Sequence, residues 1–217
     1  NGDVERKFWK DDFSVDSSDN YNSVLDGTVT FTPVSGYVEF SNSTNPNLGH
    51  GLVLDHGSAV RKITGVFEPS SDGTDCVVIF GLSADGTFDS SSTGTIKPTN
   101  GIALFRYGQP NSYKIGVLQN GTFVASSAST FSLDMVASTK TVIDIVIETS
   151  EIKVYSNGVL KSTLAYAYSS DNLYPYIGYK GTTETLKWYE LTVSPSISYA
   201  DDFATDTSER YQAVTGT

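Results

Sequence analysis

Short runs of alternating apolar and polar residues recur along the chain, and Gly, Asn, Asp, Ser and Pro residues separate them. This pattern is typical of antiparallel strands that bury one face. It predicts strands at residues 28–32, 37–41, 52–54, 60–68, 75–82, 102–107, 112–118, 122–126, 142–148, 152–156, 159–164, 174–179 and 186–193. So many strands in one domain require two stacked sheets, and the expected fold class is therefore an all-β, two-sheet antiparallel β-sandwich.

Two turns can be predicted in more detail. Asn120-Gly121 separates two predicted strands, and Asn157-Gly158 separates two others. An Asn-Gly pair supplies the two positive φ angles that a type I′ turn needs. The sequence therefore predicts a β-hairpin at each of these positions.

Three polar stretches, at residues 42–51, 83–100 and 167–173, are too long to be tight turns. Ordered loops of this length often carry binding sites because a rigid scaffold positions them. A plain solvated connection is the alternative for each of them.

The start of the chain is repeated near its end. Residues 11–24 return as residues 201–214, and seven of the fourteen positions are identical. Self-similarity at a fixed offset indicates a tandem array. We expect one unit to span residues 9–195. Residues 1–8 would then be a linker or the exit of a preceding domain, and residues 196–217 a linker with the first strand of a following repeat.

The charge and composition exclude several classes of function. The chain of 217 residues carries 25 acidic and 14 basic residues, so its formal net charge of −11 would repel a phosphate backbone. No apolar run is long enough to span a membrane, and the single cysteine, Cys76, lies in an apolar run. Few Lys and Cys residues and the acceptor patterns at Asn42 and Asn120 suit an extracellular protein. We expect no nucleic-acid partner and no membrane insertion.

The acidic excess also suits a structural Ca²⁺ ion, because calcium prefers oxygen ligands from Asp-rich turns. Several aspartates stand at either end of tight turns or in the repeated segment. The candidate ligands are Asp11, Asp12, Asp16, Asp72, Asp75, Asp85 and Asp89. The alternative is plain turn chemistry, for which Asp-Gly is common.

The segment at residues 151–163, with the strand before it at 141–148, resembles the paired strands of laminin-G-like and concanavalin A-like domains. Asp11-Asp12-Phe13 and residues 188–193 are similar to the first and last strands of such domains, which lie near each other. The resemblance implies a jelly roll of two curved sheets. Members bind glycans, bridge matrix proteins, hydrolyse polysaccharides or act as spacers, so the fold does not settle the function.

Residues 1–14 also resemble the end of a domain from archaeal and bacterial surface proteins that leads into a concanavalin-like module. This second resemblance implies a large prokaryotic, possibly archaeal, cell-surface protein.

Enzymes of the same superfamily carry an E-x-D-x-(x)-E pattern on one strand. In residues 142–148, Ile143, Ile145 and Ile147 share the face expected in the core, and Asp144 on the other face matches the central aspartate. Val142 and Val146 stand where the two glutamates would be. Glu148 lies about 13 Å from Asp144 at ~3.3 Å per residue, which is too far for a retaining pair. We therefore expect no hydrolase.

Aromatic residues offer a different chemistry, since a sugar needs an exposed ring for its apolar face. The chain has 13 Tyr, 11 Phe and 2 Trp. Tyrosines at alternate positions should face one way, and two others flank the turn at 109–111. The candidate glycan-binding residues are Tyr107, Tyr113, Tyr166, Tyr168, Tyr174 and Tyr176. The alternative is that these tyrosines pack in the core or against one another.

These observations predict a non-catalytic, extracellular module for carbohydrate binding or adhesion to a cell-surface partner. The first alternative is a purely structural repeat of a stalk, sheath or filament. Residues 201–217 would then be a strand donated to a neighbouring copy, which is a form of self-association. The second alternative is a polysaccharide hydrolase.

Overall fold

The structure is a computed structural model that describes residues 8–24, 27–43, 49–55, 57–71, 75–89, 96–169 and 172–195. Residues 1–7 and 196–217, which include the second copy of the repeat and the segment expected to be donated, lie outside the described residues, as do His56 and Asp72. The described residues form strands and two 3-10 helices, η1 (Ser18–Asn20) and η2 (Pro33–Ser35). Across them, no helix has the length and apolar character needed to cross a membrane.

The larger sheet has eight strands, and all of its pairings are antiparallel. Its order is β15 (Val159–Leu164), β14 (Ile152–Ser156), β13 (Thr141–Ile147), β6 (Lys62–Pro69), β17 (Thr185–Ser194), β4 (Tyr37–Ser43) and β3 (Gly27–Thr32), with β1 (Trp9–Asp11) also paired to β17. Central pairs such as β6 and β17 join segments that are far apart in the sequence.

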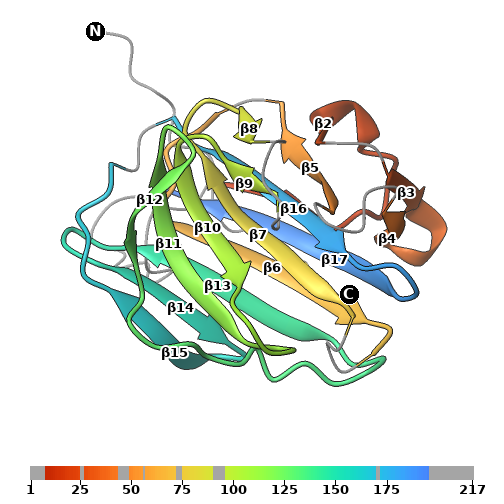
Figure 1. Cartoon of the computed structure of the whole chain (residues 1–217). Helices are drawn as coiled ribbons and strands as arrows, with labels where there is room; N and C mark the ends of the chain where they lie inside the picture. The colour runs from red at the N-terminus through yellow and green to blue at the C-terminus, as the bar shows by residue number, and fades with distance from the viewer. Residues whose placement is uncertain are drawn as a thin grey trace, which may run out of the picture.

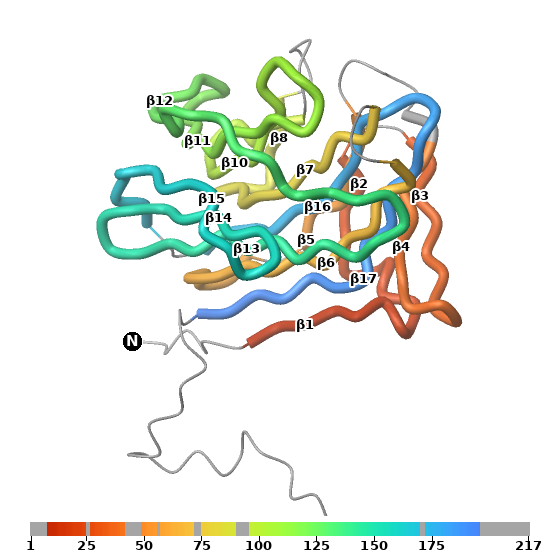
Figure 2. The backbone as a smooth tube through the Cα atoms, turned by 90° about the horizontal axis from the view of Figure 1, so that it is seen from below, coloured from red at the N-terminus to blue at the C-terminus, as the bar shows by residue number. Residues whose placement is uncertain are grey.

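The second sheet has seven antiparallel strands and lies in front of the first in Figure 1. Its order is β12 (Thr122–Ser126), β11 (Tyr113–Gln119), β10 (Gly101–Arg106), β7 (Val77–Ser83), β16 (Tyr174–Lys180), β5 (His50–Leu54) and β2 (Tyr21–Val24). A small third sheet pairs β8 (Phe88–Asp89) with β9 (Lys97–Pro98). Figure 2 shows the two large sheets as stacked layers. The predicted two-sheet antiparallel sandwich is confirmed.

The core lies between the two sheets. Trp188 on β17 is fully buried, and its ring lies 5.3 Å from that of Phe67 and 5.6 Å from that of Phe80 across the interface. Gly65 allows this packing, because a Cβ atom there would lie 2.5 Å from the Trp188 ring. The three isoleucines of β13 face this core, as the alternation predicted.

Both predicted hairpins are present. The φ angles are +50° and +75° at Asn120 and Gly121, and +48° and +77° at Asn157 and Gly158. Each pair joins adjacent strands, β11 to β12 and β14 to β15. The backbone N–H of Val142 also donates to the Asn157 side chain at 2.9 Å, which ties this turn to β13.

The first and last described strands lie side by side, as the resemblance implied. Trp9 of β1 pairs with Val193 of β17, and Asp11 pairs with Leu191 (Figure 2). Strands β1, β2, β8 and β9 were not predicted, because each is four residues long or shorter and shows little alternation.

Candidate functional site

A cavity of about 420 Å³ opens at one edge of the sandwich, where the ends of β7, β10 and β11 meet the segment that follows β15. Its lining combines aromatic, amide and small side chains. The lining residues are Ala84, Asn100, Leu118, Gln119, Asn120, Tyr166, Ala167, Tyr168, Ser169 and Leu173. Two of the three long polar stretches in the sequence, 83–100 and 167–173, therefore contribute to one cavity.

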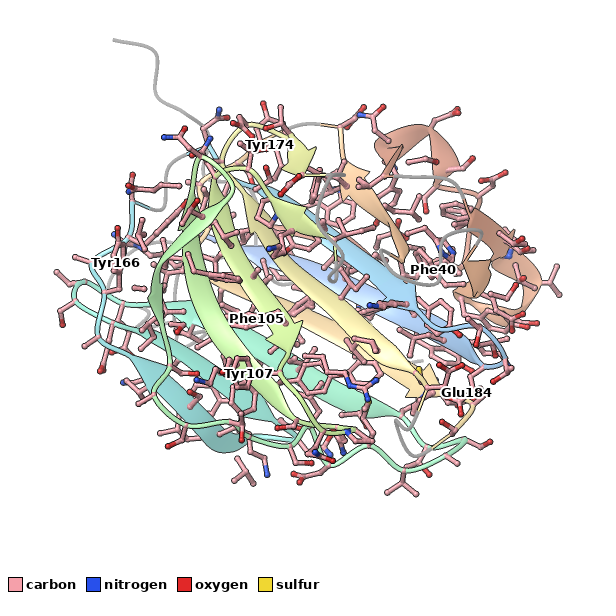
Figure 3. The ribbon with its side chains drawn as sticks, viewed as in Figure 1. Phe40, Phe105, Tyr107, Tyr166, Tyr174 and Glu184 are labelled. Carbon is pink, nitrogen blue, oxygen red and sulfur yellow. The ribbon has the colours of Figure 1, made fainter. Side chains whose placement is uncertain are left out.

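Tyr166 and Tyr168 form the aromatic wall. Their ring centroids are 6.3 Å apart with an angle of 41° between the planes, so the alternate spacing does place both rings together. Both rings are partly buried and pack against the edge of the core. Figure 3 shows Tyr166 at the left-hand edge of the front sheet, away from Phe105 and Tyr107. Burial, with the nearby Tyr166 and Asp85, raises the pKa of Tyr168 to about 12, so its hydroxyl keeps its proton at neutral pH.

The lining also includes a wall of amide groups from Asn100, Gln119 and Asn120. The Gln119 Nε2 group donates to the Tyr166 hydroxyl at 3.4 Å. The Asn100 Nδ2 group donates to Asp85 Oδ2 at 3.0 Å, and the Asn120 backbone N–H donates to Asn100 Oδ1 at 3.0 Å. An asparagine amide has two N–H donors, and Asp85 uses one of them. Three loops are therefore joined around a wall of hydrogen-bonding groups.

Asp85 holds this wall together from behind the cavity. Burial raises the pKa of Asp85, but hydrogen bonds from Thr87, Asn100 and Ser83 outweigh it and lower the pKa below its ordinary value. The Thr87 backbone N–H donates to Asp85 Oδ1 at 2.9 Å. Because the carboxylate stays charged, it is a strong acceptor that fixes the orientation of Asn100.

Several of the other aspartates proposed as calcium ligands accept hydrogen bonds from nearby backbone N–H groups. Asp11 accepts from the Phe13 N–H, Asp12 from the Ser14 N–H and Asp16 from the Ser18 N–H. Asp75 Oδ2 accepts hydrogen bonds from the backbone and side chains of Thr182 and Thr183. Asp89 and Lys97 are register partners in the backbone pairing of β8 with β9, and Asp72 lies outside the described residues.

Among the described side chains, no three His, Cys, Asp or Glu residues gather as a metal centre would require. The structure therefore gives the calcium prediction no assembled group of ligands, and it stays a prediction.

Two of the proposed sugar-binding tyrosines are buried, so the prediction is wrong for them. Tyr113 is 0% exposed, and its hydroxyl accepts a hydrogen bond from the backbone N–H of Val78 at 3.0 Å. Tyr176 is 2% exposed, since the ring of Phe88 covers it at 5.1 Å. Neither ring can stack on a sugar. Tyr174 packs partly buried beside Tyr176, and Tyr107 is exposed but far from Tyr166 in Figure 3.

The acidic residues weighed for hydrolysis lie elsewhere. Asp144 is on the outer face of the eight-stranded sheet, where it pairs with Lys62 at 3.1 Å and accepts from the Thr64 hydroxyl. Glu148 pairs with Lys153 at 2.8 Å. Neither residue lines the cavity.

The sequence did not identify Asn100, Gln119 or Ser169 as site residues. Asn120 was recognised only as a turn residue and an acceptor pattern. The available signal was the length of the two polar loops, because nothing in the sequence shows which loop ends meet in space.

No family model matches the sequence, and no curated protein matches it. Three solved structures of similar fold are the Crh5 transglycosylase in complex with NAG, the Bacillus licheniformis β-glucanase and the carbohydrate recognition domain of Emp47p. The first is 14% identical, with a TM-score of 0.60 over 87% of this chain and 84% of that one. The β-glucanase is 10% identical, with a TM-score of 0.61 over 86% and 97% of the two chains. The Emp47p domain is 14% identical, with a TM-score of 0.60 over 90% and 100%. At these identities the likeness shows the fold alone, which is the concanavalin A-like jelly roll that the resemblance implied.

Proposed function

We propose that this chain is a non-catalytic carbohydrate-binding module and that the cavity beside Tyr166 and Tyr168 is its binding site. The observation that carries the proposal is the composition of the lining, in which two tyrosine rings stand beside three side-chain amides and, among the described residues, no carboxyl group. We further propose that the module is extracellular, which its few lysines and single cysteine support.

Each wall suits one part of a neutral sugar. The apolar face of a pyranose ring stacks on an aromatic ring, and its hydroxyl groups exchange hydrogen bonds with amides, which both donate and accept. Tyr168 adds a hydroxyl that is protonated at neutral pH. A largely preformed cavity with a few fixed polar groups is the usual form of a small-ligand site.

The lining also favours binding over hydrolysis. A retaining glycosidase places two carboxyl groups about 5–5.5 Å apart on either side of the scissile bond. Asp85 is the acidic residue tied to this wall, and its carboxylate already accepts hydrogen bonds from Thr87 and Asn100. The expected role of Asp85 is therefore to hold the amide wall in place.

A glycan array followed by calorimetric titration of the best neutral oligosaccharide tests the proposal. Tyr166→Ala and Tyr168→Ala should each weaken binding about fivefold or more, as expected for a central aromatic contact. Tyr155→Ala, which removes a partly buried tyrosine on β14, is the matched control and should leave the affinity unchanged. Full affinity in both cavity variants would place the site elsewhere. Release of reducing sugar from the bound glycan would show catalysis.

A further inference from the structure

The lysines on the two sides of the sandwich differ in their partners. On the eight-stranded sheet, five lysines form ion pairs with carboxylates, namely Lys10 with Glu190, Lys62 with Asp144, Lys153 with Glu148 and Glu151, Lys161 with Asp134, and Lys187 with Glu39. Lys114 and Lys180 on the seven-stranded sheet, and Lys97 on β9 beside it, have no ion pair in the described part of the chain. On the other side of the sandwich, Lys140 before β13 is the one described lysine without an ion pair, and it lies 3.6 Å from the centre of the Tyr189 ring. In a protein with a net charge of −11, three such lysines on one side form an unusual surface.

Two of these lysines lie on aromatic rings that are linked through the ring of Phe105. Lys97 Nζ is 5.2 Å from the centre of the Phe123 ring, and Phe123 lies 4.3 Å from Phe105. The Phe105 ring lies 6.5 Å from Tyr107, and Lys114 Nζ is 4.4 Å from the Tyr107 ring. We name this chain of contacts, together with Lys180, the cationic strip.

The cationic strip lies on the outer face of the seven-stranded sheet. On β10, Ile102 and Leu104 belong to the core, so Phe105 between Leu104 and Arg106 points the other way. Gly116 lets the Phe123 ring lie close to the sheet, since a Cβ atom at this position would lie 2.6 Å from it. Figure 3 shows Phe105 and Tyr107 close together over the front sheet. Tyr107 is 56% exposed and offers the most accessible ring of the strip.

Lys180 extends the strip across the sheet. Ile177 and Tyr179 of β16 face the core, so Lys180 shares the outer face with Gly178. Burial lowers the pKa of Lys180, and the positive charge of Arg106 lowers it further.

We propose that the cationic strip binds the carboxylate or sulfate groups of an acidic polysaccharide, at a surface separate from the cavity. Lysine ammonium groups donate up to three hydrogen bonds each, so a lysine on a ring still has donors for an anionic group. Phe123, Lys114 and Phe105 lie on the adjacent strands β12, β11 and β10, which are spaced about 4.8 Å apart, and Lys180 lies two strands further along on β16. A linear polyanion can follow such a row across the strands. Tyr107 provides a ring for the sugar itself.

The choice of polysaccharide over nucleic acid rests in part on the proposed carbohydrate-binding function. It also rests on charge, because a chain of net charge −11 repels a dense polyphosphate, while the strip offers only a few cations. Tighter binding of nucleic acid than of an acidic polysaccharide would therefore contradict the proposal.

The test uses two matched pairs of polymers, polygalacturonate with its methyl ester, and dextran sulfate with dextran. We expect the folded chain to bind one acidic polymer and not its neutral partner, with an affinity that falls as salt is raised. Lys114→Gln combined with Lys180→Gln should weaken this binding about tenfold, as expected for losing charged hydrogen bonds. The control is Lys140→Gln with Lys187→Gln on the other sheet, which makes the same charge change and should have little effect.

The neutral oligosaccharide bound in the cavity separates the two proposals. The double lysine variant should bind it normally, and Tyr166→Ala should bind the acidic polymer normally. Equal binding of acidic and neutral polymers, equal losses in both double variants, or tighter binding of double-stranded DNA than of either acidic polymer would overturn the inference. Thermal unfolding midpoints of all variants show whether a loss reflects unfolding.

Discussion

The outer face of the seven-stranded sheet has a covered half and an open half. Over β7, β16, β5 and β2, a second apolar cluster of Val24, Val53, Ile79, Ile96 and Tyr176 is buried, with Phe88 and Tyr174 packed against it. Over β10, β11 and β12, the rings of Phe105 and Phe123 stay partly exposed beside lysines. Both halves carry aromatic rings. Among the described residues, Phe88 and Ile96 of the β8–β9 segment cover the first half, while that segment reaches the second half through Lys97 on the Phe123 ring.

The covering layer comes from the segment between β7 and β10, which carries β8 and β9. Phe88 of β8 contacts the Tyr176 ring edge-on at 88°. The same segment supplies Asn100 and the Asp85 turn to the cavity. One insertion therefore covers part of the sheet, builds one wall of the cavity and leaves the remaining strands open to a ligand.

We expect the largest loss of stability from a substitution in the covered half. Tyr176→Ala removes a ring that is 2% exposed, lies over Gly81 and donates a hydrogen bond to the Ile102 carbonyl at 3.3 Å. We expect it to lower the free energy of unfolding by about 3–5 kcal/mol, the usual cost of deleting a buried aromatic side chain. Urea denaturation followed by circular dichroism measures it.

Phe123→Ala in the open half is the matched comparison. Because this ring is partly exposed, its removal should cost only about 1–2 kcal/mol by the same measurement. If the two substitutions cost the same, Phe123 is a structural residue like Tyr176, and the distinction between the halves fails.

The sequence predicted the sheets better than their outer faces. Alternation identifies which strands have a buried side, and Asn-Gly pairs locate turns, because both signals are local. Alternation places Tyr174 and Tyr176 on one face of β16, but it does not reveal whether that face meets solvent or is covered by Phe88. Covering depends on a loop that returns over the sheet, and no local pattern in residues 84–100 specifies where it lies.

The cavity shows the same limit in another form. Tyr166 and Tyr168 were recognised because residues two positions apart in an extended segment point to the same side, and their rings do lie together in the structure. Asn100 and Gln119 were missed because they reach the cavity from β10 and β11 only after the strands pair, and an isolated amide carries no signal of its own.

A buried histidine on the core side of β5 gives a pH-dependent test of the strands that lie beneath the covered half. His50 on β5 is 0% exposed and packs against Phe40 and Tyr179, and burial lowers its pKa although a hydrogen bond to the Thr28 carbonyl opposes this. Below pH ~6.5 the unfolded chain binds a proton at this position that the folded chain excludes, so stability falls as the pH falls.

Hydrogen exchange at pH 7.5 and pH 5.5 measures where this loss occurs. We expect the protection factors of β5 and β2, corrected for the pH dependence of intrinsic exchange, to fall at the lower pH while those of β11 and β12 change little. His50→Gln should remove most of the difference. A uniform fall of the protection factors in all strands, or an unchanged difference in the variant, would show that other groups control the acid response.

The smallest expected effect lies on the other sheet, where charges are already paired. Asp144→Asn keeps an oxygen that can accept from Thr64 but removes the charge that pairs with Lys62 at 3.1 Å. A single ion pair near the surface contributes about 0.2–1 kcal/mol, so the free energy of unfolding should fall by no more than about 1 kcal/mol. Binding of neutral and acidic glycans should not change, because Asp144 belongs neither to the cavity nor to the cationic strip. Reducing-sugar release from polysaccharides is measured with the unmodified chain and with Asp144→Asn. If the unmodified chain releases sugar and the variant does not, the outer face of the eight-stranded sheet is an active site, and the proposal of a non-catalytic module fails.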